Sequence, residues 1–468
     1  MPSPLPAGRL PREQIMNAEN AELPPDSDSQ RAPRFALLIV FLTVFIDLLG
    51  FGIVLPVLPR QAEPYLNAIG MPPLEGGAGG AVIGILFSVF SLMQFVFSPI
   101  WGRLSDRYGR RPILLLSLSG SVIFYALYGY AVSVPVDPQP TRDGAVLALS
   151  LILLARVGAG IAGASVGTAA AVIADCTTPE NRARGMALIG IAFGGGFTLG
   201  PLIAYFGLAV FDEARWGVGA IASLLSGVAL LIAIFVFRET RRPGAGASKE
   251  FPSVARSLTV LRMPMIGGLV LIYFLTIFAM AGFESTLALL TKATFGMGDD
   301  ANFLVFASIG FVLMLAGGGY RPLAKRLPER RLLGAGVLLM LLGLAAVGGI
   351  AWALSGREPD VVAAGFWPSA FYAAASVAVC GFAFVNPSVS AIISRRADAD
   401  RQGEVLGVNQ SFASLARILG PMTGMTLFSL HPSHALPYAA AVAVLLLVAG
   451  LLPRTTGEPN DSLTGHPG

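Results

Sequence analysis

Twelve runs of mainly apolar residues follow one another along the chain, and this feature constrains the fold more than any other. A helix needs about 20 apolar residues to cross a hydrocarbon core about 30 Å thick. We place the runs at residues 35–58, 80–101, 112–134, 145–174, 185–210, 216–237, 264–290, 302–320, 332–354, 367–394, 405–430 and 435–452. They predict an all-α integral membrane protein with twelve transmembrane helices.

The composition supports a chain that lies in lipid. Hydrophobic residues make up 54% and charged residues 13%, whereas soluble domains contain about 25% charged residues. The alternating pattern of barrel strands is absent from the apolar runs. The two cysteines, Cys176 and Cys380, exclude a disulfide scaffold and a cysteine-based zinc motif. We find no phosphate loop, nucleotide fingerprint or nucleophile elbow, so we predict neither an enzyme nor a bound cofactor.

The basic residues indicate how the chain crosses the membrane. They fall in short clusters between the apolar runs, which indicates topology rather than nucleic-acid binding. Of the 32 lysines and arginines, 25 lie on the side of the N-terminal tail, five on the other side, and two within runs, Arg156 and Arg417. Cytoplasmic loops carry the excess of basic residues. We therefore expect both termini to be cytoplasmic.

The sequence contains an internal repeat. Residues 102–112 (GRLSDRYGRRP) and 321–331 (RPLAKRLPERR) each separate two apolar runs and differ in position by 219. Gly200–Pro201 and Gly420–Pro421 differ by 220. One common offset predicts two pseudo-symmetric six-helix bundles. Parallel six-helix repeats are typical of transporters with a substrate site between the halves near the bilayer midplane.

This repeat defines the expected domain organisation. We predict a disordered cytoplasmic tail, an N-terminal bundle, a cytoplasmic linker, a C-terminal bundle and a second tail, at residues 1–34, 35–237, 238–263, 264–452 and 453–468 respectively.

Four motifs carry a resemblance to a known family. Residues 102–111 resemble the loop signature of the major facilitator superfamily. Residues 47–59 (DLLGFGIVLPVLP) resemble the first span of the twelve-helix drug:proton antiporters, especially the tetracycline exporters, as do residues 401–407 and 414–421. In the third span those exporters have an acidic residue before a tyrosine, where this chain has Phe124–Tyr125, which argues against tetracycline itself.

The resemblance implies a conformational latch in the first repeated loop. The carboxylate of Asp106 would hold the two halves together on the cytoplasmic side and release them during transport. A basic loop that only fixes topology, with Asp106 in an incidental ion pair, is the alternative. The latch residues are Gly102, Asp106, Arg107, Gly109, Arg110 and Arg111.

Four charged residues lie within the predicted spans, where ionisable groups are costly and usually functional. Asp47 and Arg156 lie at matching depths, so we expect them to face each other or a shared cavity. Asp47 would carry a proton or contact substrate, or it would form a static pair with Arg156 or bind the open backbone around Gly50 and Gly52. Glu284 should lie towards the outer face, where it either couples protons or pairs with Lys292. Arg417 should lie near the middle of the bilayer, where it either neutralises an acidic group of the substrate or protein or donates hydrogen bonds to backbone carbonyls near Gly420–Pro421.

Small and aromatic residues suggest hinges and a binding cavity. Glycine and proline in the fifth and eleventh spans predict hinges at Gly196, Gly200, Pro201, Gly420 and Pro421, although tight helix packing would use the same residues. Aromatic and amide side chains suit an amphipathic cargo. Candidate cavity residues are Phe51, Gln94, Tyr125, Tyr273, Phe278, Asn386, Asn409 and Gln410. His431 and His434 form a weak pattern for a metal, and we predict no metal site.

These features predict a secondary active transporter in a cytoplasmic (inner) membrane. We expect proton-coupled efflux of amphipathic small molecules, tetracycline-like in kind, by alternating access. The expected partners are the small-molecule cargo, protons and the lipid bilayer, with no nucleic acid, and we expect a monomer. Two alternatives stay open: a proton-coupled or facilitative metabolite transporter on the same fold, and a non-transporting binding or scaffold protein.

Overall fold

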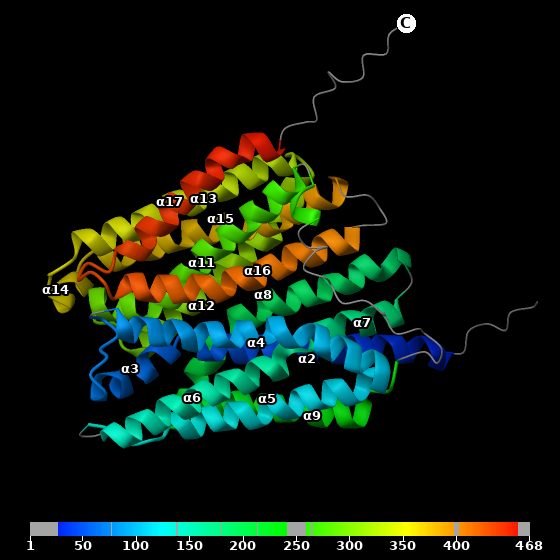
Figure 1. Cartoon of the computed structure of the whole chain (residues 1–468), viewed down its shortest axis with the longest axis horizontal. Helices are drawn as coiled ribbons and strands as arrows, with labels where there is room; N and C mark the ends of the chain where they lie inside the picture. The colour runs from blue at the N-terminus through cyan, green and yellow to red at the C-terminus, as the bar shows by residue number, and fades with distance from the viewer. Residues whose placement is uncertain are drawn as a thin grey trace, which may run out of the picture.

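The computed structural model describes residues 27–75, 77–136, 139–177, 179–212, 214–240, 259–263, 265–396 and 402–456. Over these residues the chain is helical and contains no strand, as Figure 1 shows. The prediction of an all-α protein is confirmed.

The first half of the chain forms six long helical segments. They are α2 (Ser27–Val54), α4 (Ala78–Tyr108), α5 (Arg110–Val132), α6 (Arg142–Ala162) continued through η1 (Gly163–Ser165) into α7 (Val166–Cys176), α8 (Pro179–Val210) and α9 (Gly217–Val236). The short helix α3 (Leu58–Ala68) follows α2.

The second half repeats this arrangement. Its long helices are α11 (Ile266–Phe295), α12 (Asp299–Ala324), α13 (Glu329–Ala353), α15 (Trp367–Arg396), α16 (Gln402–Phe428) and α17 (Leu436–Thr456). The short helix α14 (Pro359–Ala363) lies between α13 and α15. Each of the twelve predicted runs thus corresponds to one long helical segment.

Ten helices in the described residues are long and apolar enough to cross a membrane. The helices α8 and α16 are outside that number, although they contain 32 and 27 residues. Within α8, the segment Thr198–Val210 is a shorter apolar helix. The helix α16 is more polar than the others because it carries Asn409, Gln410 and Arg417.

Some predicted boundaries differ from the structure. The helix α2 begins at Ser27 rather than at residue 35 and ends at Val54. Pro56, which lacks an amide proton, lies in the turn before α3, and Pro59 occupies its first turn, where proline is tolerated. The helix α17 continues to Thr456, beyond the predicted end at residue 452. Residues 1–26 and 457–468, and most of the predicted linker (241–258), lie outside the described residues.

The helices of the two halves gather into two groups that lie side by side in Figure 1, with α2 to α9 in blue to green and α11 to α17 in green to red. The short helices α3 and α14 lie at one end of the molecule, which we call the α3 end. The helix α2 begins, and α17 finishes, at the opposite end, which we call the termini end.

The pairing of helices follows the internal repeat. Within the halves, α2 packs on α8 just as α11 packs on α16. Between the halves, the main contacts join α4 to α16 and α8 to α12. Counted among the twelve long helices, α4 and α16 are the second and eleventh, and α8 and α12 are the fifth and eighth. The second helix of one half thus contacts the fifth helix of the other half in both pairs. This agrees with a duplicated six-helix unit.

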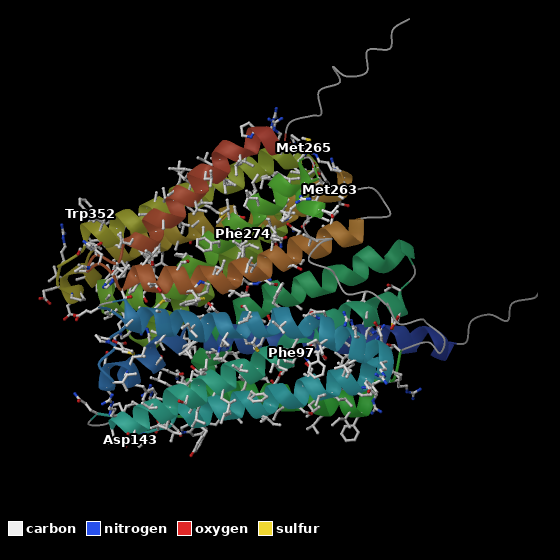
Figure 2. All side chains as sticks on the ribbon, in the orientation of Figure 1. Phe97, Asp143, Met263, Met265, Phe274 and Trp352 are labelled. Carbon is white, nitrogen blue, oxygen red and sulfur yellow. The ribbon has the colours of Figure 1, made fainter. Side chains whose placement is uncertain are left out.

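Large apolar side chains cover the outside of both groups. Phe206, Phe235 and Leu447 are more than half exposed, as lipid-facing residues are. Trp352, also exposed, lies near the α3 end of α13, whereas Met263 and Met265 lie near the termini end (Figure 2). Tryptophan is enriched at membrane interfaces. The exposed surface therefore fits a lipid environment.

Glycines set the closest helix contacts within the first half. A Cβ atom at Gly52 of α2 would lie 2.6 Å from the Gly196 carbonyl oxygen of α8, and one at Gly200 would lie 2.6 Å from the Gly52 carbonyl carbon. Both helices can approach this closely only without side chains at these positions. Gly200 and Pro201 lie within a continuous α8.

The second half has the equivalent contact between α11 and α16. A Cβ atom at Gly420 would lie 2.8 Å from the Phe278 carbonyl oxygen, and one at Gly424 would lie 2.8 Å from the Gly282 Cα atom. Pro421 also lies within an unbroken helix. The predicted hinge glycines therefore stand at tight packing contacts, and bending at these positions stays a prediction.

Candidate functional site

A small cavity lies between the two halves of the molecule. Its volume is about 30 Å³, enough for about one water molecule. The first half contributes Leu55, Phe87 and Ser91. The second half contributes Ala281, Glu284, Ser285, Arg417 and Pro421. An acid and a base thus face one cavity between the halves.

Glu284 and Arg417 interact electrostatically across this cavity. They do not form a direct ion pair, and within the described chain neither side chain hydrogen-bonds to another protein group. Their proximity follows from the glycine contacts above, because Gly282 precedes Glu284 on α11 and Gly420 follows Arg417 on α16. Close packing of α11 and α16 places the two charges at the same position along the helix pair.

The structure gives the contacts of both residues, and their functional roles stay predictions. Glu284 lines an internal cavity rather than pairing with Lys292, because the Lys292 ammonium group binds the Glu63 carboxylate. Arg417 makes no hydrogen bond to a carbonyl near Pro421 in the described residues.

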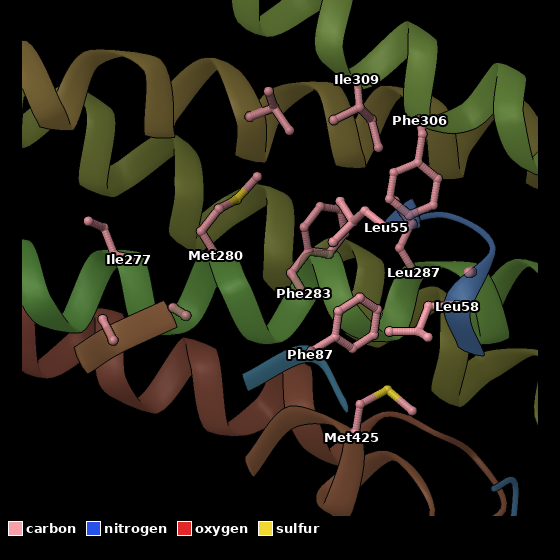
Figure 3. Close-up of a cluster of buried hydrophobic side chains, with 14 of the residues drawn as sticks. Leu55, Leu58, Phe87, Ile277, Met280, Phe283, Leu287, Phe306, Ile309 and Met425 are labelled. Carbon is pink, nitrogen blue, oxygen red and sulfur yellow. The ribbon is translucent and has the colours of Figure 1, made fainter. Parts of the chain in front are cut away.

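An apolar cluster with members from both halves lies around the cavity. Figure 3 shows side chains from both halves in this cluster. Leu55 and Phe87 also line the cavity, and Phe283 flanks Glu284. The labelled members from the first half are Leu55, Leu58 and Phe87, and those from the second half are Ile277, Met280, Phe283, Leu287, Phe306, Ile309 and Met425.

Beyond this cluster, Arg60 of α3 binds the second half. Its Nη1 atom lies 2.8 Å from Oδ1 of Asp299, the first residue of α12. Its Nη2 atom donates to the Met297 carbonyl at 2.8 Å, and its Nε atom to the Ala288 carbonyl at 3.2 Å. The Arg60 side chain is only 7% exposed. One guanidinium thus links α3 to the ends of α11 and α12.

A second ion pair lies beside the first. The Lys292 ammonium group of α11 donates to Oε2 of Glu63 on α3. We call Arg60, Glu63, Lys292 and Asp299 the clamp, because these four residues join the halves at the α3 end. Nearby, the Asn302 amide donates to the Pro56 carbonyl at 2.8 Å, again between the halves.

Small residues on α4 allow close contact with α16 between the halves. A Cβ atom at Gly84 would lie 2.8 Å from the Met422 Cα atom, and Gly80 lies against the Met425 carbonyl oxygen. The Ser88 hydroxyl donates to the Ile418 carbonyl. These three residues are four apart, and this spacing of small residues is typical of close helix contacts in membranes. Our sequence prediction missed it, although the spacing is visible there.

Arg156 is buried in the first half, with 2% of its surface exposed. Its Nε atom donates to the Leu86 carbonyl of α4 at 3.2 Å, and its guanidinium lies 4.5 Å from the centre of the Phe90 ring. The Asp47 side chain lies outside the described side chains. The expected pairing of Asp47 with Arg156 therefore stays a prediction.

The predicted cavity residues whose side chains are described do not line the small cavity. The Gln94 amide donates to the Gly163 carbonyl at 3.0 Å, and Tyr125 packs against Gly50 of α2. Gln410 is exposed, whereas Asn409 is buried.

Three other predicted residues are also absent from the lining of this cavity. Tyr273 is buried on α11, Phe278 stacks on Phe274, and Asn386 accepts a hydrogen bond from Ser390. The Phe51 side chain is outside the described side chains. Contact between these predicted residues and a cargo stays a prediction.

One of the predicted latch residues, Arg110, is buried and has several partners. The Arg110 guanidinium binds the carboxylates of Asp106 on α4 and, at 3.0 Å, Asp175 on α7. It also donates to the Ser105 hydroxyl at 2.7 Å. The Glu239 carboxylate accepts from the Arg110 backbone amide at 2.9 Å, at the N-terminus of α5.

Asp106, Asp175 and Ser105 belong to the first half, and Glu239 follows α9 at the start of the predicted linker. Gly109, between α4 and α5, has a φ of +107°, a conformation that favours glycine. Gly102 faces open space, and the Arg111 guanidinium binds the Ile234 carbonyl of α9. Arg107 lies over the neighbouring Tyr108 ring. A contact from Asp106 to the second half stays a prediction.

The two histidines at the α3 end have structural partners. His434 stacks on the Phe428 ring at 4.3 Å, and its Nδ1 atom donates to the Phe428 carbonyl at 2.9 Å. Burial is the main cause that lowers the pKa of His434 below its usual value. Among the residues that the structure describes, no group of three potential metal ligands occurs.

Fold and cavity together define a membrane transporter built from two six-helix halves. Residues 40–421 and 322–465 match the family model described as Major Facilitator Superfamily. The chain belongs to this superfamily.

Two kinds of curated relatives resemble the chain over most of its length. The Bos taurus protein named major facilitator superfamily domain-containing protein 10 is 29% identical over 480 residues, which cover 94% of this chain and 97% of the relative. The class D tetracycline resistance protein of Salmonella ordonez is 30% identical over 404 residues, which cover 84% of this chain and 89% of the relative.

Solved structures give the same fold. The crystal structure of the human organic anion transporter MFSD10 (TETRAN) superposes with a TM-score of 0.57 at 26% identity, covering 92% of this chain and all of that one. The structure of a D-xylose-proton symporter gives a TM-score of 0.67 at 18% identity, covering 90% and 99% of the two chains.

Proposed function

We propose that this transporter exports amphipathic small molecules from the cytoplasm and is driven by the proton gradient. The similarity to tetracycline resistance proteins supports efflux of such molecules. The excess of lysine and arginine on the termini end supports a cytoplasmic orientation of that end in an inner membrane. The closed α3 end would then face the outside.

The observation that carries the proposal is the pair of Glu284 and Arg417 in one cavity. A charged group within a membrane is costly and usually marks an ion or substrate pathway. Here both charges lack direct partners in the described chain, and they line a cavity between the two moving halves. Opening that cavity to either side changes hydration and nearby charge, which are the factors that control protonation of a carboxylate.

Alternating access gives the clamp its role in this proposal. The clamp and the α4–α16 contact hold the α3 end closed, so cargo reaches the cavity from the termini end. Separation of the halves at the clamp would release the cargo outside. A proton from the outside then binds a buried carboxylate and returns with it, which drives the cycle.

A second candidate is transport of organic anions. The Arg417 guanidinium offers a positive charge to the cavity, and a structural relative at 26% identity is called an organic anion transporter. An anionic cargo would bind Arg417, whereas a cationic cargo would bind Glu284. The charge of the cargo therefore separates the two candidates.

Transport by the purified protein in lipid vesicles tests the proposal. Accumulation of ethidium and of tetracycline is measured with a pH gradient, without one, and with a proton ionophore. The proposal predicts accumulation that depends on the gradient and stops with the ionophore. Equal flux in all three conditions would indicate a facilitative transporter, and absence of flux across a broad panel of ligands would favour a binding or scaffold protein.

A further inference from the structure

We propose that the Glu284–Arg417 pair makes the sense of proton coupling depend on the charge of the cargo. An amphipathic anion binds together with a proton, whereas an amphipathic cation exchanges for one. This inference rests on the proposed function, since it takes the cavity between the halves, widened when the termini end opens, as the cargo site.

The first step is the isolation of the pair. The described lining contributed by the first half is uncharged and consists of Leu55, Phe87 and Ser91. On α11 and α16 the other titratable group that interacts with the pair is Tyr273, which lies near Arg417. In the described chain Arg417 is therefore the charged group that acts on Glu284, and Tyr273 and Glu284 act on Arg417.

Groups on the remaining neighbouring elements have partners of their own. The Tyr438 hydroxyl of α17 hydrogen-bonds to Thr286 at 2.9 Å. Lys292 and Glu63 neutralise each other between α11 and α3, and Arg60 binds Asp299 of α12.

The second step is the effect of an anion. In the empty cavity the positive charge of Arg417 favours the ionised form of Glu284, and the two charges sum to zero. An anion bound to Arg417 cancels that positive charge, so Glu284 becomes a buried carboxylate without compensation. Such a carboxylate takes up a proton. The cavity then holds Arg417, the anion and a neutral Glu284, and its net charge is again zero.

A cation has the opposite effect. A cationic cargo binds the Glu284 carboxylate and displaces the proton, because the cation and the proton compete for the same carboxylate oxygens. Where Glu284 is neutral in the empty cavity, the cavity has one net positive charge before and after the exchange; where Glu284 is already ionised, the cation releases no proton. Anions and protons thus favour each other, and cations and protons compete.

Thermodynamic linkage gives the size of the effect. A proton and a cargo that share one coupled site change each other's affinity by the same factor. Where one proton is taken up per anion, anion affinity rises about tenfold for each pH unit of acidification, and cation affinity falls about tenfold where one proton is released. The two slopes have opposite signs.

The experiment measures binding of two probes with the same ring and opposite charge, 1-naphthylacetate and 1-naphthylmethylammonium. Calorimetric titration of the full-length protein in detergent, at several pH values and in buffers of different ionisation enthalpy, gives affinity and the number of protons exchanged. We expect proton uptake with the anion and proton release with the cation.

Two variants assign the effect to this pair. Glu284→Gln should still bind the anion but without proton uptake, and Arg417→Gln should lose anion binding. Glu358→Gln and Arg357→Gln, both exposed near the α3 end, serve as matched controls and should behave as wild type. Thermal unfolding and gel filtration establish that each variant is folded.

The same sign of proton exchange for both probes would overturn the inference, as would wild-type proton exchange in Glu284→Gln or no saturable anion binding. Failure of the proposed function looks different, because vesicle transport would then be independent of the proton gradient. Opposite signs of proton exchange in detergent would still support the inference as a binding property of the pair.

Discussion

Arg60 on α3 and Asp299 on α12 form an ion pair of 2.8 Å that joins the two halves of the transporter. The two partners differ in burial, since the Arg60 side chain is 7% exposed and that of Asp299 is 54% exposed. Arg60 also satisfies the Met297 and Ala288 carbonyls. Within the clamp, Arg60 should therefore contribute most to the stability of the closed α3 end.

Arg60→Gln should open the α3 end. The variant leaves carbonyls without their donor and Asp299 without its partner, which should destabilise the closed state by about 2–4 kcal/mol. Asp299→Asn should cost only about 0.5–1 kcal/mol, because an exposed pair contributes little. Spin labels at Asn67→Cys and Asp360→Cys, with Cys176 and Cys380 replaced, measure the distance between the halves.

The matched control for Asp299→Asn is Asp300→Asn, since Asp300 is a neighbouring exposed acid outside the clamp. Distances identical to wild type in Arg60→Gln would show that the clamp does not hold the α3 end closed.

Gly424→Ala should separate α11 from α16. The added Cβ atom would lie 2.8 Å from the Gly282 Cα atom, so one helix must shift. Overpacking of this kind costs about 1–3 kcal/mol. We expect a lower midpoint of thermal unfolding in detergent. Gly407→Ala on the same helix faces open space and should leave the midpoint unchanged or raise it. Equal midpoints for both variants would contradict the packing argument.

The latch predicted from the sequence can be tested with the same labels. If Asp106 binds the second half when the α3 end is open, Asp106→Asn should shift the population towards the closed α3 end described above. The distance between labels at Asn67→Cys and Asp360→Cys should then shorten on average. Asp143→Asn, exposed at the start of α6, is the control. An unchanged distance distribution would leave Asp106 with only its contacts inside the first half.

Stability should fall at mildly acidic pH because of His434. Burial lowers the pKa of His434 below the usual 6.5, so the unfolded chain binds a proton at a higher pH than the folded chain does. The stabilisation is fully present above about pH 6.5 and is lost as the pH falls from there towards the pKa of the folded protein. Unfolding midpoints against pH for wild type and His434→Gln measure this difference, and parallel curves would contradict it.

The sequence predicted the fold well because lipid imposes a simple rule on it. A span must be a long apolar run, and its backbone N–H and C=O groups must hydrogen-bond to each other within the helix. The length of the runs and the repeat offset were therefore sufficient to predict the fold. Boundaries were less accurate where proline acts locally, as at Pro56, or where a helix continues past the apolar run, as at Thr456.

The site was only partly predictable. Depth along a single helix identified Glu284 and Arg417 as buried charges, but their common cavity depends on contacts between α11 and α16, which are distant in the sequence. Arg60 and Lys292 looked like topology signals, because a charge pattern assigns a side of the membrane and not a partner. The contact of Gly80, Gly84 and Ser88 with α16 was readable from spacing alone.

The central claim is that a carboxylate in the cavity between the halves couples the proton gradient to transport. The most direct test compares Glu284→Gln with wild type and with Glu358→Gln in the same lipid vesicles. Accumulation of ethidium driven by a pH gradient is measured beside exchange of labelled for unlabelled ethidium without a gradient. We expect Glu284→Gln to keep exchange and lose gradient-driven accumulation by at least about tenfold, which corresponds to about 1.4 kcal/mol. Accumulation by Glu284→Gln at the wild-type level would contradict the claim.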